Sequence, residues 1–238
     1  MGRLDGRVAI VTGGTGALGR AVSEAFLREG ATVIAPYIVP EEVPLLQNRV
    51  GDLKTRLEVP NADVNKEDQV KTLVQQVVAK HGKVDILVNL VGGFWGGFPV
   101  AETEEKDWDA MLNLNLKTAF LCCKTVVPEM KKRNWGRIVC VSSRTGALGA
   151  GDFAAYAVAK GALITFVRSL AEEVLEDNIT VNAIAPSTID TEANRKAMPS
   201  RDFSKWVPPE EIAKVLVFLC SEDSRIISGA FVPVYGKA

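Results

Sequence analysis

The chain has 238 residues, of which 47% are hydrophobic, and its 28 lysines and arginines nearly balance 29 carboxylates, for a formal net charge of -1. This composition supports a large core and argues against a chain that binds mainly nucleic acid or an anionic membrane through its overall charge. The N-terminus carries no basic-then-apolar leader, and no apolar run is long enough to span a bilayer. We therefore expect a soluble cytoplasmic protein.

The cysteines and the single histidine limit the possible chemistry. Cys122, Cys123, Cys140 and Cys220 form no C-x-x-C pair and lie in apolar surroundings, so we expect buried, reduced thiols. His81 lies at a predicted helix end, where we expect a C-capping role. One histidine argues against a Ser-His-Asp triad and against a histidine-rich metal site. We therefore predict no metal, and acid/base chemistry that depends on tyrosine, lysine or carboxylates.

A glycine-rich turn near the N-terminus organises the sequence. The apolar run 8–11 predicts a strand buried on both faces, and a helical pattern follows over 21–27. Between them, Gly14, Gly16 and Gly19 fit the G-x-G-x-x-G spacing of a dinucleotide-binding turn. Glycine lets the backbone approach a pyrophosphate, and the helix N-terminus offers unpaired N–H groups to phosphates. The alternative is a tight βα turn with no ligand.

Strand and helix patterns alternate along the rest of the chain. Strands are predicted at 31–35, 55–59, 83–91, 137–141, 179–184 and 230–234. Helices are predicted around 70–78, 103–108, 118–130, 153–175 and 208–220, with at most a short helix near Pro36, Pro40 and Pro44 and an irregular polar segment at 193–208. The alternation predicts an α/β fold, a doubly wound (Rossmann) parallel sheet of about seven strands with helices on both faces. With no linker or repeat, residues 1–238 are expected to form one domain.

Ligands bind at the carboxyl ends of the strands in a doubly wound sheet. The residues that follow the predicted strands therefore share one edge; they are 12–19, Tyr37, Asp63, 89–97, 142–143 and 185–191. We expect the binding site at this edge.

Tyr156 and Lys160 form the most chemically suggestive pair. They lie four residues apart on the long predicted helix and share one of its faces. A nearby ammonium favours the phenolate, so we expect the pKa of Tyr156 to fall and to suit proton transfer. Ser143 follows the predicted strand 137–141 at the ligand edge, where its hydroxyl could hydrogen-bond a substrate oxygen. The alternatives are a solvated helix face for the pair, a helix cap for Ser143, and a polar helix position for Asn115.

Several motifs in order resemble those of the short-chain dehydrogenase/reductase family, over essentially the whole chain. The turn at 12–19 resembles the family's T-G-x-x-x-G-x-G, and Asp63-Val64 resembles its adenine contact. Residues 89–92 resemble N-N-A-G, and 186–191 resemble the P-G-x-I-x-T stretch that meets the nicotinamide. Ser143 stands at the usual separation from Tyr156, which favours it over Ser142.

The resemblance implies a catalytic tetrad of Asn115, Ser143, Tyr156 and Lys160. Tyr156 would exchange a proton with a carbonyl or alcohol oxygen that Ser143 hydrogen-bonds, while nicotinamide transfers hydride. Lys160 would lower the pKa of Tyr156 and hold ribose hydroxyls, and Asn115 would position a water. The cofactor contacts implied are Gly13, Thr15, Gly16, Leu18, Gly19, Tyr37, Asp63, Val64, Asn89, Tyr156, Lys160, Pro186, Ile189 and Thr191.

The chain departs from the family pattern at four positions. Ala17 stands for the second motif glycine, Leu90 and Val91 replace Asn and Ala, and Ser187 stands where glycine is usual. None of these belongs to the tetrad, so we expect effects on local geometry rather than on activity.

The residue at the end of the second predicted strand bears on the choice between NAD(H) and NADP(H). An acid at its end usually marks NAD by binding the adenosine ribose, and here that position holds Tyr37. No Arg or Lys stands there for a 2′-phosphate, Glu41 and Glu42 lie beyond, and Arg20 follows the turn. The position lacks an acid, and the chain is similar to family members that have a tyrosine and use NADP(H). Both observations favour NADP(H) over NAD(H).

The substrate pocket should draw on loop 94–98, on Phe153 and on 193–206. The aromatic residues suggest an apolar or ring-bearing carbonyl or alcohol, unless they only pack the loops. Segment 193–208 is expected to be a mobile lid. Its cations, Arg195, Lys196, Arg201 and Lys205, fit either an anionic substrate group or a solvated face.

Other readings of the same fold remain open. One is a nucleotide-sensing regulator without turnover, against which a complete tetrad argues. Another is an epimerase or dehydratase, which usually carries a larger C-terminal substrate domain. Family likeness further implies a homotetramer, with the long helix and the last strand as interfaces.

Overall fold

A seven-stranded parallel sheet forms the centre of the protein. The computed structural model describes residues 2–237. The sheet order is β3-β2-β1-β4-β5-β6-β7, and all pairings are parallel. The strands are β1 (Val8–Thr12), β2 (Thr32–Ile34), β3 (Leu57–Glu58), β4 (Ile86–Asn89), β5 (Gly136–Val141), β6 (Ile179–Pro186) and β7 (Phe231–Val234). The strand order reverses between β1 and β4, and the crevice at such a switch point is where doubly wound sheets bind ligands.

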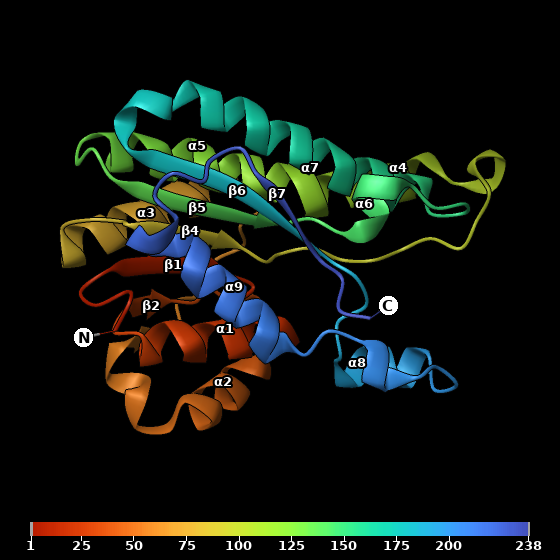
Figure 1. Cartoon of the computed structure of the whole chain (residues 1–238), viewed down its shortest axis with the longest axis horizontal. Helices are drawn as coiled ribbons and strands as arrows, with labels where there is room; N and C mark the ends of the chain where they lie inside the picture. The colour runs from red at the N-terminus through yellow and green to blue at the C-terminus, as the bar shows by residue number, and fades with distance from the viewer. Residues whose placement is uncertain (1, 238) are drawn as a thin grey trace.

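Helices cover both faces of this sheet (Figure 1). The helices are α1 (Ala17–Arg28), α2 (Glu42–Val50), α3 (Glu67–His81), α4 (Glu105–Leu112), α5 (Thr118–Lys131), α6 (Arg144–Leu148), α7 (Ala154–Glu173), α8 (Glu192–Ala197) and α9 (Pro209–Cys220). Buried residues of α1, α2 and α9 pack on one face of the sheet, and those of α3, α5 and α7 pack on the other. The predicted doubly wound α/β fold is confirmed.

The continuous apolar runs form strands because both faces of the sheet are covered. Every residue of β1, β4, β5 and β6 is buried, including Thr12 and Asn89 at two carboxyl ends. Such strands cannot alternate polar and apolar side chains, which explains the uniform pattern read from the sequence. All four cysteines are free and buried, as expected.

Several element boundaries differ from prediction. Residues 51–56 form a 3-10 helix, so β3 is only two residues long. Residues 42–50 do form α2, and the segment expected to be irregular contains α8 and a short 3-10 helix at Phe203–Lys205. Thr191 explains α8, because its hydroxyl accepts a hydrogen bond from the backbone N–H of Asn194 and so caps the helix.

His81 does not act as the expected cap. Gly82, in the left-handed conformation with φ of 75°, ends α3 and donates from its N–H to the Val78 carbonyl. The His81 ring instead pairs with a carboxylate oxygen of Glu58, with Nε2 at 2.8 Å from Oε1. This contact ties the end of α3 to the edge strand β3.

Helix α7 is the one described helix that is long and apolar enough to cross a membrane by length and composition, with a mean hydropathy of 1.2. No such segment was expected from the sequence. Leu163, Val167 and Leu170 of this helix are buried in the core beside the sheet. Its apolar character therefore has an explanation in the packing of the fold.

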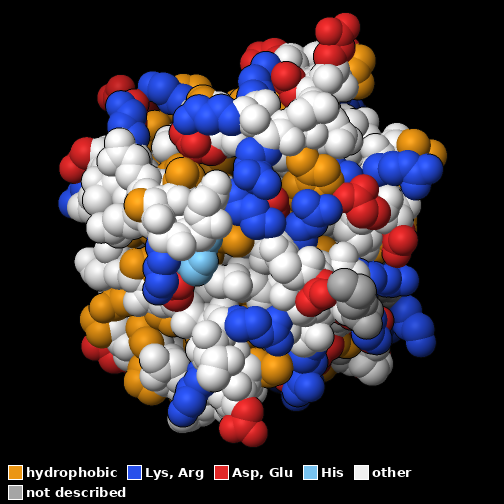
Figure 2. All heavy atoms as spheres, turned by 90° about the vertical axis from the view of Figure 1, so that its left-hand side faces the viewer, with side chains coloured by type: hydrophobic (Ala, Val, Ile, Leu, Met, Phe, Trp, Pro, Cys, Tyr) orange, Lys and Arg blue, Asp and Glu red, His pale blue; other side chains and the backbone are white. Residues whose placement is uncertain are grey.

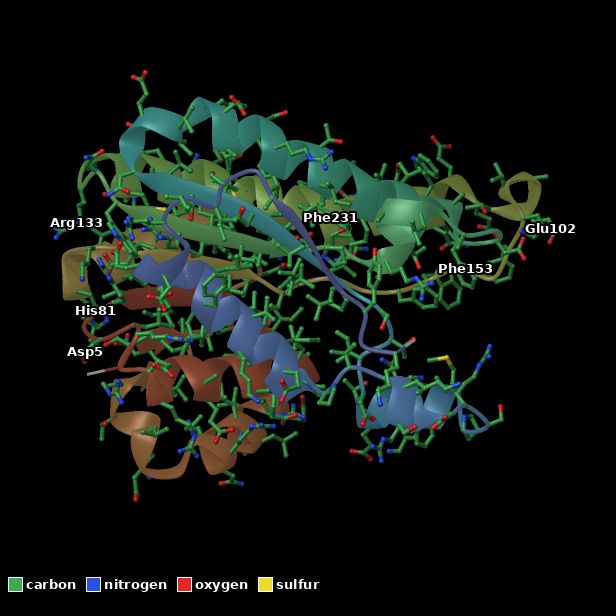
Figure 3. All side chains as sticks on the ribbon, in the orientation of Figure 1. Asp5, His81, Glu102, Arg133, Phe153 and Phe231 are labelled. Atoms are coloured by element: carbon green, nitrogen blue, oxygen red, sulfur yellow. The ribbon has the colours of Figure 1, made fainter. Side chains whose placement is uncertain are left out.

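The two ends of the sheet differ in character. Figure 3 places Phe153 at the end toward which the strands run, and His81 and Arg133 at the opposite end. That opposite end faces the viewer in Figure 2, where lysine and arginine side chains are interspersed with carboxylates. The glycine turn, α6 and the start of α7 all follow strand ends at the Phe153 end, so the candidate site lies there.

Candidate active site

The turn from β1 into α1 is compact because its glycines touch. Gly13 adopts a φ of 67°, which favours glycine. A methyl group at Gly19 would overlap the carbonyl oxygen of Gly13 and lie 2.6 Å from Gly14 Cα. A methyl group at Gly14 would lie 2.8 Å from the Val11 carbonyl oxygen. These glycines are needed for α1 to start directly against the end of β1.

Gly16 differs, and it provides a test of whether a nucleotide fits. A methyl group there would meet only the Gly13 oxygen, at 3.4 Å, so the protein itself leaves the space open. Gly16 is the N-cap residue of α1, and in the described chain no side chain caps this N-terminus. Unpaired N–H groups with room in front of them suit a phosphate. The turn therefore fits a dinucleotide, while Ala17 is exposed at the start of the helix.

The residues predicted to meet the adenosine half follow β2, β3 and β4. Tyr37 is half-buried after β2 and pairs through its backbone with Pro60 and Ala62, beside the β3 end. Asp63 accepts from the N–H of Asn65, and Val64 is buried. Both predicted adenine contacts thus lie next to Tyr37 at one edge.

Asn89 links the glycine turn to the middle of the sheet. Its Oδ1 accepts a hydrogen bond from the hydroxyl of Thr12, at 2.9 Å, which joins the carboxyl ends of β1 and β4. Its buried Nδ2 has no hydrogen-bond partner in the described chain. In the structure, therefore, Asn89 orders the sheet edge below the nucleotide turn.

Asn115 lies in a π-helical segment, Asn113–Lys117, between α4 and α5. Its Oδ1 accepts from the N–H of Gly93 at 3.1 Å, and its Nδ2 donates to the carbonyls of Gly93 and Met111. Such π-bulges often occur at functional sites. Here the widened turn brings a fully buried amide against the loop that follows β4.

Gly92 separates Asn115 from Lys160. A methyl group at Gly92 would lie 2.7 Å from Asn115 Oδ1 and 2.9 Å from Lys160 Nζ. Two members of the predicted tetrad therefore meet at one point of the backbone, and a side chain at Gly92 would have to displace at least one of them. Leu90 and Val91, the departures from the family pattern, pack into the cores on the two faces of the sheet.

Ser143, Tyr156 and Lys160 come together where β5 ends. Ser143 begins α6, accepts from the N–H of Thr145, and shares a side-chain hydrogen bond with Tyr156. Lys160 is buried, and its Nζ donates to the Val141 carbonyl at 2.8 Å. Ser142 points elsewhere, because its hydroxyl donates to the backbone carbonyl of Lys160. Ser142 thus holds α7 against β5, and Ser143 faces Tyr156.

The pKa of Tyr156 contradicts the expectation that Lys160 lowers it. Burial raises the pKa of Tyr156 above its usual value, and the hydrogen bond from Ser143 only partly offsets this effect. Burial also lowers the pKa of Lys160 to about 8. The sequence could not reveal this, because four-residue spacing says nothing of how dry the shared helix face is.

These residues line a cleft of about 580 Å³. Its walls combine residues of the glycine turn, the loop after β4, α6, α7 and the segment after β6: Leu18, Leu90, Gly92, Gly93, Phe94, Val141, Ser142, Ser143, Arg144, Thr145, Tyr156, Lys160, Pro186, Ser187, Thr188, Ile189, Asn194 and Met198. Of the predicted aromatics, Phe94 lines the cleft and meets Tyr156 edge-on, with ring centroids 5.0 Å apart. Trp95 and Phe98 pack against each other.

Cations of the predicted lid pair with neighbouring carboxylates. Arg195 bonds Asp190, Lys196 bonds Glu192, and Lys205 lies 4.0 Å from Asp202. These contacts favour the reading of a solvated face over a substrate-binding one. The departure at Ser187 is explained as well, because its hydroxyl donates to the Tyr235 carbonyl and ties the segment after β6 to the C-terminal residues.

The sequence alone did not point to two charged residues that lie near the site. Arg144 follows Ser143 directly and lines the cleft, with its guanidinium 5.3 Å from the Tyr235 ring. Glu42, set aside as too distant, accepts a hydrogen bond from Thr15 in the glycine turn at 2.7 Å. The adjacency to Ser143 was a usable signal for Arg144. For Glu42 the sequence held no such signal, because the contact arises only when α2 packs back against the glycine turn.

Comparisons with known proteins agree with this geometry. The family model described as short chain dehydrogenase matches residues 7–202. The 3-oxoacyl-[acyl-carrier-protein] reductase FabG of Thermotoga maritima is 36% identical over 242 residues, covering 98% of each chain. The 3beta-hydroxysteroid dehydrogenase of Mediterraneibacter gnavus is 30% identical, covering 98% of this chain and 94% of its own.

A solved structure shows the same fold with a nucleotide. The NADP-bound structure of ElxO superposes with a TM-score of 0.91 at 28% identity, covering 97% of each chain. The chain therefore belongs to the short-chain dehydrogenase/reductase family of oxidoreductases.

The turn geometry predicts different effects for two similar substitutions. Gly19→Ala should lower the free energy of unfolding by about 1–3 kcal/mol, because the methyl group is forced onto the Gly13 carbonyl. Gly16→Ala should leave stability nearly unchanged yet weaken NADH and NADPH binding, since it fills the space kept open before α1. Thermal unfolding without nucleotide and fluorescence titration would measure the two effects. Equal loss of stability in both variants would contradict this account of the turn.

Burial of Lys160 should cost stability at neutral pH. Because its folded pKa of about 8 lies below the unfolded value, the cost is fully present below about pH 8 and disappears toward pH 10.5. Lys160→Met should therefore raise the free energy of unfolding at pH 7 by about 1–2 kcal/mol, after loss of the bond to Val141, and by less at pH 10. Urea denaturation at both pH values tests this, with the exposed Lys117→Met as control. A loss of stability at pH 7 would refute it.

Proposed function

We propose that the protein interconverts a carbonyl compound and an alcohol with a nicotinamide cofactor, using Tyr156 as general acid and base. The observation that carries the proposal is the hydrogen bond between Ser143 and Tyr156 beside the buried Lys160, in one cleft with the segment after β6. The membership in a family of oxidoreductases supports it.

Three groups of residues would hold the cofactor. The turn at Gly13, Thr15, Gly16, Leu18 and Gly19 would take the phosphates, and Tyr37, Asp63, Val64 and Asn89 would border the adenosine half. Pro186, Ile189 and Thr191 would border the nicotinamide, with Tyr156 and Lys160 at its ribose. The cofactor supplies the hydride to the carbonyl carbon, or accepts it from the alcohol. The NADP bound by ElxO supports a nicotinamide cofactor for this fold.

The chain itself handles the proton. In the reducing direction Tyr156 gives its hydroxyl proton to the substrate oxygen, and Ser143 hydrogen-bonds that oxygen while negative charge develops. Lys160 lies within the same buried region and, with a pKa of about 8, would carry its positive charge there at pH 7 and hold the ribose hydroxyls of the cofactor. Asn115, fixed on Gly93, would position a water that returns a proton through Lys160.

The side chains that line the cleft indicate a class of substrate. Phe94 beside Tyr156 favours an apolar or ring-bearing carbonyl compound. The relatives act on substrates as different as 3-oxoacyl-[acyl-carrier-protein] and 3beta-hydroxysteroids, according to their names. Asn194 and Met198 line the cleft from segment 193–208, which supports its role as a substrate lid. We place the enzyme, as one domain, in the cytoplasm.

We further propose a homotetramer, with α7 and β7 among the interfaces. Exposed apolar side chains support this arrangement: Phe120 on α5 and Val158 on α7 are each 45% exposed. Light scattering should give four times the chain mass; a monomeric mass would contradict the proposal.

The alternative function is a nucleotide sensor without turnover. Such a sensor would also use the glycine turn, but it would need no acid/base pair. The burial of Tyr156 and Lys160 around Ser143 favours turnover. Oxidation of NADH or NADPH with any member of a carbonyl panel would exclude the sensor.

Tyr156→Phe tests the role of the phenol. It should lower kcat by about 100-fold or more, because the proton donor is lost while the ring packing against Phe94 is kept. Binding of NADH or NADPH, followed by nicotinamide fluorescence, should change little. Near-normal turnover would remove Tyr156 from the mechanism.

Ser143→Ala should change the pH dependence as well as the rate. The Ser143 hydrogen bond lowers the pKa of Tyr156, so its loss should move the rise of alcohol oxidation with pH to higher pH. The profile of kcat/KM against pH measures this shift. A lower rate with an unmoved profile would show that Ser143 does not act on Tyr156.

A further inference from the structure

A carboxylate from α2 reaches the nucleotide turn. Glu42 is half-buried in the first turn of α2, and its Oε2 accepts the hydrogen bond from the Thr15 hydroxyl at 2.7 Å. Thr15 is buried between glycines of the turn. The contact brings a negative charge from a helix after β2 to the residues that would cradle the cofactor.

The topology places this carboxylate on the adenosine side. The tetrad residues lie beyond β4, on the β5 and β6 side of the switch point. A dinucleotide spanning the switch point with its nicotinamide there must lay its adenosine over β1 and β2. Glu42 comes from the helix that follows β2, so it borders the adenosine ribose rather than the nicotinamide.

The charges around Glu42 do not favour binding of the 2′-phosphate that distinguishes NADP(H) from NAD(H). Residues 31–48, from β2 into α2, contain Glu41 and Glu42 and no lysine or arginine. Arg20 is the cation at the turn, but its Nη1 donates to the backbone carbonyl of Thr15. It also contributes, after Lys196, to the lowered pKa of Glu192 in α8, which places its charge toward the lid.

We infer that Glu42 selects NAD(H) over NADP(H). Its carboxylate accepts hydrogen bonds from the adenosine ribose diol, with the Thr15 hydroxyl holding it in place, and it repels a 2′-phosphate. In many dinucleotide sites an acid at the strand end does this. Here the acid comes from α2, because the strand end holds Tyr37. The inference rests on the proposed function, and it departs from the expectation of NADP(H) based on Tyr37.

Fluorescence titration with NADH and NADPH tests the inference by binding alone. Wild-type protein should bind NADH at least 10-fold more tightly than NADPH. Glu42→Gln keeps an oxygen for Thr15 but removes the charge, so the ratio of the NADPH Kd to the NADH Kd should fall at least 10-fold, about 1.4 kcal/mol. Glu41→Gln is the matched control, because it removes a neighbouring exposed charge, and the ratio should stay within about twofold.

The outcomes separate the inference from the proposed function. If neither nucleotide binds the wild type, the proposed function fails. If both bind but Glu42→Gln leaves the ratio unchanged, or weakens both equally, Glu42 only ties α2 to the turn and the inference fails. Added salt gives a second reading: it should lower the ratio in the wild type more than in Glu42→Gln, since it screens the repulsion. Equal salt dependence would overturn the inference.

Discussion

The close approach of α1 to the end of β1 is the constraint on which the site depends. Gly19 has no room for a side chain against Gly13, so the helix begins directly at the sheet edge with its N–H groups uncovered. Gly16, in contrast, faces open space. The same turn therefore combines two demands on glycine, one from internal packing at Gly19 and one, at Gly16, from the cofactor that we propose binds there. Only the first is visible as a steric conflict inside the protein.

Strand β4 links the glycine turn to the residues of the proposed tetrad. At its end Asn89 is bonded to Thr12 of β1, and a few residues later Gly92 and Gly93 lie against Asn115 and Lys160. A shift of the β4 end would thus move the nucleotide turn and the tetrad together. This coupling would suit the proposed reaction, because the turn that would hold the cofactor phosphates and the helix that carries Tyr156 lie on opposite sides of the switch point between β1 and β4 and must be aligned.

The sequence predicted the fold, and it predicted that Tyr156 and Lys160 share one helix face, because both follow from local rules. Buried parallel strands give uniform apolar runs, and the four-residue spacing sets Tyr156 and Lys160 on one helix face. The features that the sequence did not reveal depend on long-range packing or on a single side chain that caps a helix. Thr191 starts α8 within a polar stretch, and α2 folds Glu42 onto a turn far away in the sequence. The sign of the Tyr156 pKa shift was wrong because it depends on burial, which spacing does not report.

Burial shifts the pKa values of Tyr156 and Lys160 in opposite directions. A dry environment raises the pKa of Tyr156, which makes the phenol a poor base by itself. The same environment lowers the pKa of Lys160, yet only to about 8, so the ammonium survives at neutral pH. Under the proposed mechanism, a charge in this low dielectric would act on a phenolate at Tyr156 more strongly than it would in water. Burial of a charged Lys160 therefore costs the fold stability at neutral pH, and the proposed role of this residue would explain why the cost is tolerated.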